Sequence, residues 1–394
     1  MHDRGFPDLP SLAGSSALPR RLLALLLTVV LAAGAVVSPG RAAAAGNASR
    51  AAGFVEDAQN RDGGFGLRQG RKSDPETSLW ASVALLAAGK NPKDEWLKGG
   101  RSADEYLIAH RSSYRSIGDL GLLALVRSSG KLSVTQYGDP AATLRSRLSK
   151  DVARTDPEGT ALAIFGLLAD GSSASTKAAS AAGQALLDTV TSDGAWGPSG
   201  NADTSSTALV LQALVATGQA KQGDAPVTSG VAYLQAAQGN DGGLLKDTRL
   251  DKGVYKSSVP ATAFAIQALQ ALGLPTLRTP TGKTLRQGLT DYQQRASGGL
   301  TSTGAYDERT KPSVLDTGQA FAAFNGKTFD LPVVTSKTGG PANERRKQRE
   351  AKEQAKAKDE DAKPSTGPWP ATSSSSTSPP SASDPRRSSS GSGT

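Results

Sequence analysis

The sequence contains no cysteine. A chain without cysteine has no disulfide, no thiolate nucleophile and no cysteine-ligated zinc site. Histidine is nearly absent as well, since only His2 and His110 occur, and a nucleophilic triad or a histidine-rich metal site therefore has too few members. We expect no cofactor and no metal, and stability that comes from burial over a large core.

Aromatic residues make up only 5% of the chain, and no strong excess of charge of one sign is present. The formal net charge of +9 is spread over 394 residues rather than clustered on one segment. Nucleic-acid binding usually requires a clustered basic face. We therefore expect no nucleic acid as a partner.

The N-terminus has the order of features of a secretory signal. Residues 22–38 form an uncharged apolar run, Arg20 and Arg21 precede it, and four alanines at 42–45 follow it. The arginine pair is also compatible with a twin-arginine signal. We expect cleavage after Ala45 and a secreted, cell-surface or cell-wall protein, with an uncleaved N-terminal anchor as the alternative.

The rest of the chain repeats a short turn element. Gln59, Gln238 and Gln294 are each followed by a glycine four residues later and by Phe or Leu two residues after that glycine. A fourth copy keeps only the second half of the element, Gly194-Ala195-Trp196. Regular self-similarity of this kind is typical of repeat architectures.

An apolar helix is expected after each turn, and the sequence has residues suited to begin and to end it. Asp or Ser stands 15 residues before a glycine in four frames, where it can serve as N-cap and the glycine as C-terminal stop. A hydroxyl residue lies four positions into each frame. The frames are 74–89, 156–171, 203–218 and 258–273, with looser copies that end at Gly130 and Gly326.

A more polar helical stretch precedes each apolar frame, at 49–60, 103–110, 141–150, 178–191, 226–238 and 284–295. An apolar helix that alternates with an amphipathic one predicts two layers, with the apolar helices inside. The fold class is therefore all-α, with six helical hairpins over 46–335. Residues 1–45 are the signal peptide, and 336–394, first charged and then rich in Pro and Ser, are a disordered tail.

The Gln-x-x-x-Gly-x-aromatic element before an Ala/Leu-rich helix resembles the prenyltransferase/squalene-oxidase repeat of terpenoid cyclases and protein prenyltransferases. It also resembles the α-domain of transcobalamin and intrinsic factor. Both resemblances imply an α6/α6 toroid whose inner helices line a central cavity. The alternative is a linear two-layer solenoid.

The resemblance does not extend to the residues that carry chemistry in those enzymes. The folded part has no Asp-x-Asp-Asp element, the nearest match being Thr155-Asp156-Pro157-Glu158, and no Cys/His zinc set. Asp203, Asp251 and Asp316 are carboxylates that no spacing singles out as a pair. We therefore interpret the protein as a non-catalytic binding protein, and the family resemblance implies a corrinoid, an isoprenoid or another amphiphilic small molecule as its ligand. The alternatives are a terpenoid-processing enzyme and a cell-surface interaction scaffold.

Six parallel inner helices would gather their N-termini at one mouth of the ring, where their dipoles favour an anionic or strongly polar ligand. The long connections at that mouth, such as 245–257 and 301–312, supply the candidate ligand contacts. The resemblance to the transcobalamin α-domain implies a β-rich cover over the ligand, and with none expected after the ring, a separate β-rich chain or a membrane transporter is the expected protein partner. The candidate contacts are Trp196, Arg249, Tyr255, Tyr306 and Arg309.

The predicted export is testable on the mature protein. Mass spectrometry of secreted material should find an N-terminus near Gly46, because the apolar run and the alanine site are in the order that signal peptidase recognises. Recovery of the chain only with Met1 intact and inside the cell would contradict the prediction.

Overall fold

The computed structural model describes residues 39–94, 101–252, 256–301 and 311–336, all of which belong to one compact unit, Met1–Arg346. These residues form helices and isolated bridges, with no strand in the described ranges. The expected signal segment lies almost entirely outside the described residues, and so does the expected tail from 337 onward. The helical content confirms the all-α fold class.

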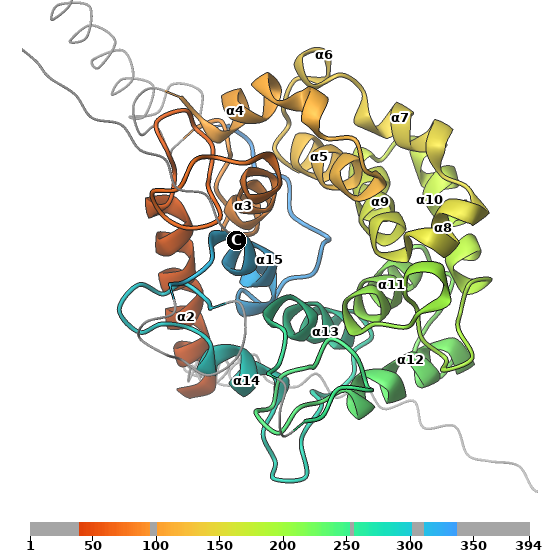
Figure 1. Ribbon diagram of the computed structural model, residues 1–394. Coiled ribbons are helices and arrows are strands. Elements are labelled where there is room, and N and C mark those ends of the chain that lie inside the picture. Colours follow the sequence, from red (N-terminus) through yellow and green to blue (C-terminus); the bar gives the residue numbers. More distant parts are fainter. Residues whose placement is uncertain (1–38, 95–100, 253–255, 302–310, 337–394) are drawn as a thin grey trace, which may run out of the picture. The chain divides into compact units, whose positions relative to one another are not determined.

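Six apolar helices form an inner ring, seen end-on in Figure 1. Each contacts the next along the chain, and the last contacts the first, so that the ring is closed. Closure confirms the α6/α6 toroid and excludes the linear solenoid. The inner helices are α3 (Pro75–Ala87), α5 (Ile117–Ser129), α9 (Pro157–Asp170), α11 (Thr204–Ala216), α13 (Val259–Ala271) and α15 (Val314–Phe324).

A second layer of shorter or more polar helices surrounds the inner ring (Figure 1). One outer helix precedes each inner helix, as the alternation of polar and apolar stretches predicts. The outer helices are α2 (Pro39–Asp57), α4 (Ala103–Ala109), α7 (Pro140–Arg147), α10 (Ser173–Leu187), α12 (Ala225–Ala236) and α14 (Leu285–Asp291). Short helical turns occur between them: η1 (Arg111–Ser113), α6 (Val134–Tyr137), α8 (Lys150–Thr155) and η2 (Pro198–Gly200).

Hydrogen bonds to backbone carbonyls join the first and last repeats where the ring closes. The Val314 backbone amide donates to the Leu67 carbonyl over 2.9 Å, and the Asn325 side-chain amide donates to the Ala87 carbonyl over 2.6 Å. Gly318 of α15 lies directly against the backbone of Trp80 in α3, where a Cβ atom would be 3.2 Å from the Trp80 carbonyl. The absence of a side chain there lets the two helices approach closely.

The N-caps expected from the sequence are present. The carboxylates of Asp74, Asp156 and Asp203 accept hydrogen bonds of 2.8 to 2.9 Å from backbone amides three residues later. At the other end, Gly89, Gly171, Gly218 and Gly273 have φ values between +66° and +77°. Gly130 departs from the prediction, because its φ is −83° and Lys131, at +51°, adopts the left-handed conformation instead.

The glutamines of the repeat hydrogen-bond the turn that links outer to inner helix. Gln59 and Gln238 are buried and donate to the carbonyls of Gly63 and Gly242 over 3.0 and 2.9 Å. In the last copy, the predicted Gln294 does not make this bond. Gln293 makes it instead, to the Gly298 carbonyl over 2.9 Å, because that turn is one residue longer.

The hydroxyl in the first turn of an inner helix links the helix to the preceding turn. In four repeats it accepts a hydrogen bond of 2.8 to 3.0 Å from the amide of the turn's Phe, Trp or Leu, and donates one of 2.6 to 2.7 Å to the carbonyl of the N-cap residue. We call these residues the hydroxyl clamp; they are Ser78, Thr207, Thr262 and Thr317.

Replacing a clamp hydroxyl by a methyl group should destabilise the ring. Thr262→Val leaves the buried Leu244 amide without its acceptor, which typically costs about 1 to 3 kcal/mol. Thr228→Val is the control, because the Thr228 hydroxyl also bonds a carbonyl four residues earlier but is exposed. Urea unfolding should show the loss only for the first variant; equal stability of the two would contradict the role of the clamp.

Candidate functional site

The N-termini of four inner helices surround a pocket of about 490 Å³. We call this end of the ring the N-terminal mouth. Residues of the first turns of α3, α5, α9 and α11 line the pocket, together with Trp80, Pro198 and Gln319. The sequence-based expectation that the inner helices point the same way and gather their N-termini at one mouth therefore holds for these four.

Carboxylates dominate the lining of this pocket. Five acidic side chains line it against one basic side chain, that of Lys246. An anionic ligand would be repelled by this set, so the expectation that the mouth favours anions is corrected: acidic side chains already occupy the positive ends of the helices. The five are Glu76, Asp119, Asp156, Glu158 and Asp203.

Three of the five carboxylates are engaged as helix caps. Asp156 accepts from the Gly159 amide over 2.8 Å, and Asp203 accepts from both the amide and the hydroxyl of Ser206 over 2.8 and 2.7 Å. Asp119 accepts from the Ser116 amide over 3.3 Å. Glu76 and Glu158 hydrogen-bond no other residue within the described ranges and are free to act on a ligand.

The environment raises the pKa of both uncommitted carboxyl groups. Burial raises the pKa of Glu158 to about 7, with help from the negative charges of Asp203 and Asp156. Burial also raises the pKa of Glu76, and the neighbouring charges of Asp119 and Asp74 add to that effect. Glu158 is therefore about half protonated at neutral pH, which suits a carboxyl group that donates a proton.

The backbone at the single lysine of the pocket is held in place by the preceding repeat. Thr204, the first residue of α11, donates from its amide to the Lys246 carbonyl over 3.1 Å and from its hydroxyl to the Leu245 carbonyl over 2.8 Å. These bonds fix the loop between α12 and α13 against the rim. Lys246 itself is exposed, and its charge only partly offsets the rise in the pKa of Glu158.

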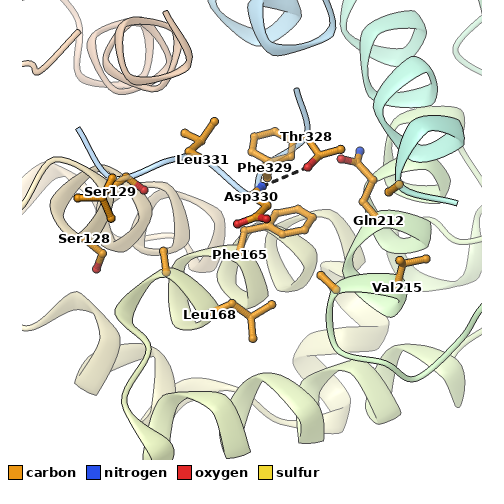
Figure 2. Close-up of a pocket in the computed structure, with 14 residues that line it drawn as sticks. Ser128, Ser129, Phe165, Leu168, Gln212, Val215, Thr328, Phe329, Asp330 and Leu331 are labelled. Carbon is orange, nitrogen blue, oxygen red and sulfur yellow. Dashed lines mark hydrogen bonds between the residues drawn. The ribbon is translucent and has the colours of Figure 1, made fainter. Parts of the chain in front are cut away.

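The opposite end of the ring is closed by the chain itself. After α15, residues 327–336 run across the C-terminal ends of the inner helices, where the Val334 amide donates to the Ser129 carbonyl over 2.8 Å. Figure 2 shows this segment over a second pocket of about 440 Å³, with Phe329 and Leu331 beside Phe165. Asn91 adds a hydrogen bond to the Val334 carbonyl.

An aromatic cluster separates the two pockets. The ring of Phe329 stacks on Phe165 at 4.8 Å between centroids and lies 6.0 Å from Trp80, which lines the N-terminal pocket. Phe264 lies 5.9 Å from Trp80 and 6.1 Å from Phe329. All four rings are buried. These side chains thus occupy the middle of the ring between the two pockets.

The residues proposed from the sequence as ligand contacts have different environments in the structure. Trp196 is completely buried and donates from Nε1 to the Leu186 carbonyl over 2.8 Å, so that it is a packing residue rather than a ligand contact. Arg249 is exposed and paired with Asp247. Tyr255, Tyr306 and Arg309 lie outside the described residues. A ligand-binding role for Arg249 and these three stays a prediction.

Glu76 and Glu158 were not predicted as site residues, although a repeated sequence pattern marks both. The tripeptide Asp-Pro-Glu occurs at 74–76 and again at 156–158, each time at the start of an inner helix. The aspartate is the cap and the proline begins the helix, which places the glutamate in the first turn at the mouth. Of the three aspartates considered from the sequence, Asp203 lines the pocket and Asp251 and Asp316 do not.

Among the described residues, no group of three or more His, Cys, Asp or Glu side chains is arranged to hold a metal ion. Within the same ranges, no helix combines the length and the hydrophobicity needed to cross a membrane.

No known protein-family profile matches the sequence, and no curated protein is similar to it. Solved structures of similar fold do exist. An unsaturated glucuronyl hydrolase specific for heparin has a TM-score of 0.50 at 14% identity, over 71% of this chain and 95% of its own. A protein described as a glycosidase has a TM-score of 0.51 at 13% identity, over 75% and 99%. A mutant unsaturated glucuronyl hydrolase from Streptococcus agalactiae has a TM-score of 0.50 at 14% identity, over 73% and 92%.

These structures share the α/α toroid, a fold of the same general kind as the terpenoid cyclase-like repeat, but the particular family named from the repeat has no matching profile. They also correct the functional interpretation. The neighbours are glycoside hydrolases, and none of those reported is a small-molecule carrier, a terpenoid cyclase, a prenyltransferase or a scaffold. The interpretation as a non-catalytic ligand-binding protein was wrong, and its two alternatives have no support.

The pKa of Glu158 makes stability depend on pH. Because the folded state holds the Glu158 proton up to about pH 7 and the unfolded chain releases it near 4.5, unfolding releases a proton between these values and stability falls as pH rises. Glu158→Gln should reduce this slope, to which the raised pKa of Glu76 also contributes, and be about 1 to 3 kcal/mol more stable than the wild type at pH 8.

Guanidinium unfolding at pH 4.5 and pH 8 measures the effect. Asp151→Asn removes an exposed carboxylate on α8 and is the matched control. An unchanged slope in Glu158→Gln, or a slope that disappears in the control, would contradict the assignment.

Proposed function

We propose that this protein is a glycoside hydrolase whose active site is the carboxylate pocket at the N-terminal mouth. The observation that supports this most directly is Glu158, an uncommitted, half-buried carboxyl group with a pKa of about 7 in a pocket that holds further carboxylates. Glycoside hydrolysis uses a pair of carboxyl groups in the large majority of enzymes, one as acid and one as base or nucleophile. The fold neighbours carry out chemistry of this class.

Glu158 is proposed as the general acid. Cleavage of a glycosidic bond needs a proton on the leaving oxygen, and a carboxyl group can supply it at neutral pH only if burial or like charge raises its pKa. Both causes act on Glu158. Its neighbours Asp156 and Asp203 are held as caps, so that they act on the pKa of Glu158 without competing for the substrate oxygen.

Glu76 is proposed as the second carboxylate, which activates water or attacks the sugar. It enters the same pocket from α3, while Glu158 enters from α9, and α5 stands between these two helices in the ring. The two glutamates thus approach a bound sugar from separate sides, as the reaction requires. Trp80, on the same helix as Glu76, forms part of the apolar wall of the pocket.

The charge of the pocket limits the substrate. With five carboxylates and one lysine at the mouth, a uronate would meet net repulsion. The neighbours named above include hydrolases of unsaturated glucuronyl groups. For this chain we propose a neutral or amino sugar instead. The signal-like N-terminus supports action on glycans outside the cytoplasm.

Assays of the purified protein on aryl glycosides of neutral and amino sugars test the proposal. Glu158→Gln and Glu76→Gln should each lower kcat/KM by about 10²- to 10⁴-fold, because each removes a proton-transfer group. In the wild type, kcat/KM should fall as pH rises above about 7, where Glu158 loses its proton.

The control is Asp188→Asn, which removes a carboxylate paired with Lys150 on the outer layer, far from the pocket lining. It should retain wild-type kcat/KM. Full activity in both glutamate variants would place the chemistry elsewhere, and absence of turnover on every glycoside class would overturn the proposed function.

A further inference from the structure

A second polar site lies on the outer layer, between the second and third repeats. A groove of about 510 Å³ is lined by three arginines, one acidic residue and an apolar floor. The arginines come from three places: Arg111 from η1, Arg115 from the connection to α5, and Arg147 from the end of α7. None of them lines the carboxylate pocket.

Each of the three guanidinium groups is held by one hydrogen bond to a backbone carbonyl. Arg115 donates to Ser112 over 2.9 Å, and Arg147 donates to the carbonyl of Arg115 over 2.6 Å. Arg111 donates to Ile108 over 3.3 Å. The bond from Arg147 to Arg115 ties two of the arginines together across the groove. Because each bond uses one donor of a guanidinium that carries five, most donors remain for a ligand.

No carboxylate of the described residues lies within 4.0 Å of these three guanidinium groups. The acidic residue of the groove, Asp139, is already engaged: it caps α7 through the Ala142 amide over 2.9 Å and lies 3.9 Å from Arg145. Three positive charges thus converge without a matching negative partner. Like charges repel one another unless an anion joins them.

The floor of the groove is apolar. Tyr114 and Tyr137 are buried there, and their hydroxyls are turned to internal partners, the Pro75 carbonyl and the Asp104 carboxylate. Leu120 and Leu123 of α5 complete the floor. The groove therefore offers a basic rim over ring faces and aliphatic side chains, a surface that fits a chain carrying oxyanions on a less polar backbone.

We propose that this groove, defined by Arg111, Arg115 and Arg147, binds an oxyanion group of a polymer, either a phosphate or a sulfate. Guanidinium groups hold both anions through paired N–H donors. The site is separate from the carboxylate pocket and does not depend on the proposed hydrolase activity.

Calorimetric titration of the wild type with inorganic polyphosphate and with dextran sulfate tests the proposal, and unmodified dextran is the uncharged comparison. We expect binding to one or both polyanions and none to dextran. The polyanion that binds more tightly identifies the source of the anion. Affinity should fall steeply with salt, because the screening length shortens from about 10 Å at 0.1 M to about 3 Å at 1 M.

Replacing Arg111, Arg115 and Arg147 together by Gln should weaken binding about tenfold or more, since each exposed contact contributes a factor of roughly two to five. The matched control replaces three other exposed arginines, Arg61, Arg68 and Arg154, by Gln and carries the same change in net charge. It should bind as the wild type does, and thermal melts should show both variants folded.

Equal loss of affinity in the two triple variants would mean that binding follows net charge alone and would overturn the site. Absence of binding to both polyanions at 0.05 M salt would overturn it as well. Because none of these measurements uses catalytic activity, failure of the hydrolase proposal leaves them unaffected.

Discussion

The two-way hydrogen bond of a first-turn hydroxyl is the constraint on which the rest of this structure depends. In four repeats, Ser78, Thr207, Thr262 or Thr317 accepts from the amide of the turn and donates to the carbonyl of the N-cap residue. One side chain thereby provides a hydrogen-bond partner for a buried backbone amide of the turn and for the carbonyl at the start of the helix. The same bond fixes how α3, α11, α13 and α15 each leave the preceding turn. In the closed ring, the N-termini of α3, α5, α9 and α11 meet at the same end.

Parallel inner helices have an electrostatic consequence at that end. Each N-terminus favours negative charge by about 0.3 to 1 kcal/mol, and the caps and first-turn acids Asp74, Glu76, Asp156, Glu158 and Asp203 follow this preference. The acids then act on one another. A pKa of about 7 for Glu158 corresponds to about 3 kcal/mol against its ionised form, more than a single helix end contributes. Burial and like charge therefore prevail over the dipole, and one acid in the group, Glu158, stays about half protonated at neutral pH.

Most of the fold, but little of the site, could be predicted from the sequence. N-caps such as Asp203 and C-terminal glycines such as Gly218 act within one turn of helix, so the helix ends could be predicted from their spacing. The hydrogen bond of the last turn from Gln293 rather than Gln294 could not be predicted, because it depends on the length of that turn. The left-handed conformation of Lys131 could not be predicted either. The carboxylate pocket combines α3, α5, α9 and α11, which are separated by some forty residues each, and only ring closure shows which first turns meet. The sequence shows no zinc set, no Asp-x-Asp-Asp element and no carboxylate pair set apart by spacing, whereas the repeated Asp-Pro-Glu marks the two uncommitted glutamates of the pocket.

The segment after the last inner helix connects the two ends of the ring through its aromatic side chain. Phe329 fills the middle together with Phe165 and Phe264 and stands behind Trp80, which lines the carboxylate pocket. Without this partition, water could reach the pocket from the C-terminal end as well as from the mouth. The raised pKa of Glu158 arises first from its removal from water, and an open lumen would weaken that cause before any neighbouring charge changed. The hydrogen bonds that hold residues 327–336 across the far end, from Val334 to Ser129 and from Asn91 to Val334, keep Phe329 in this aromatic cluster.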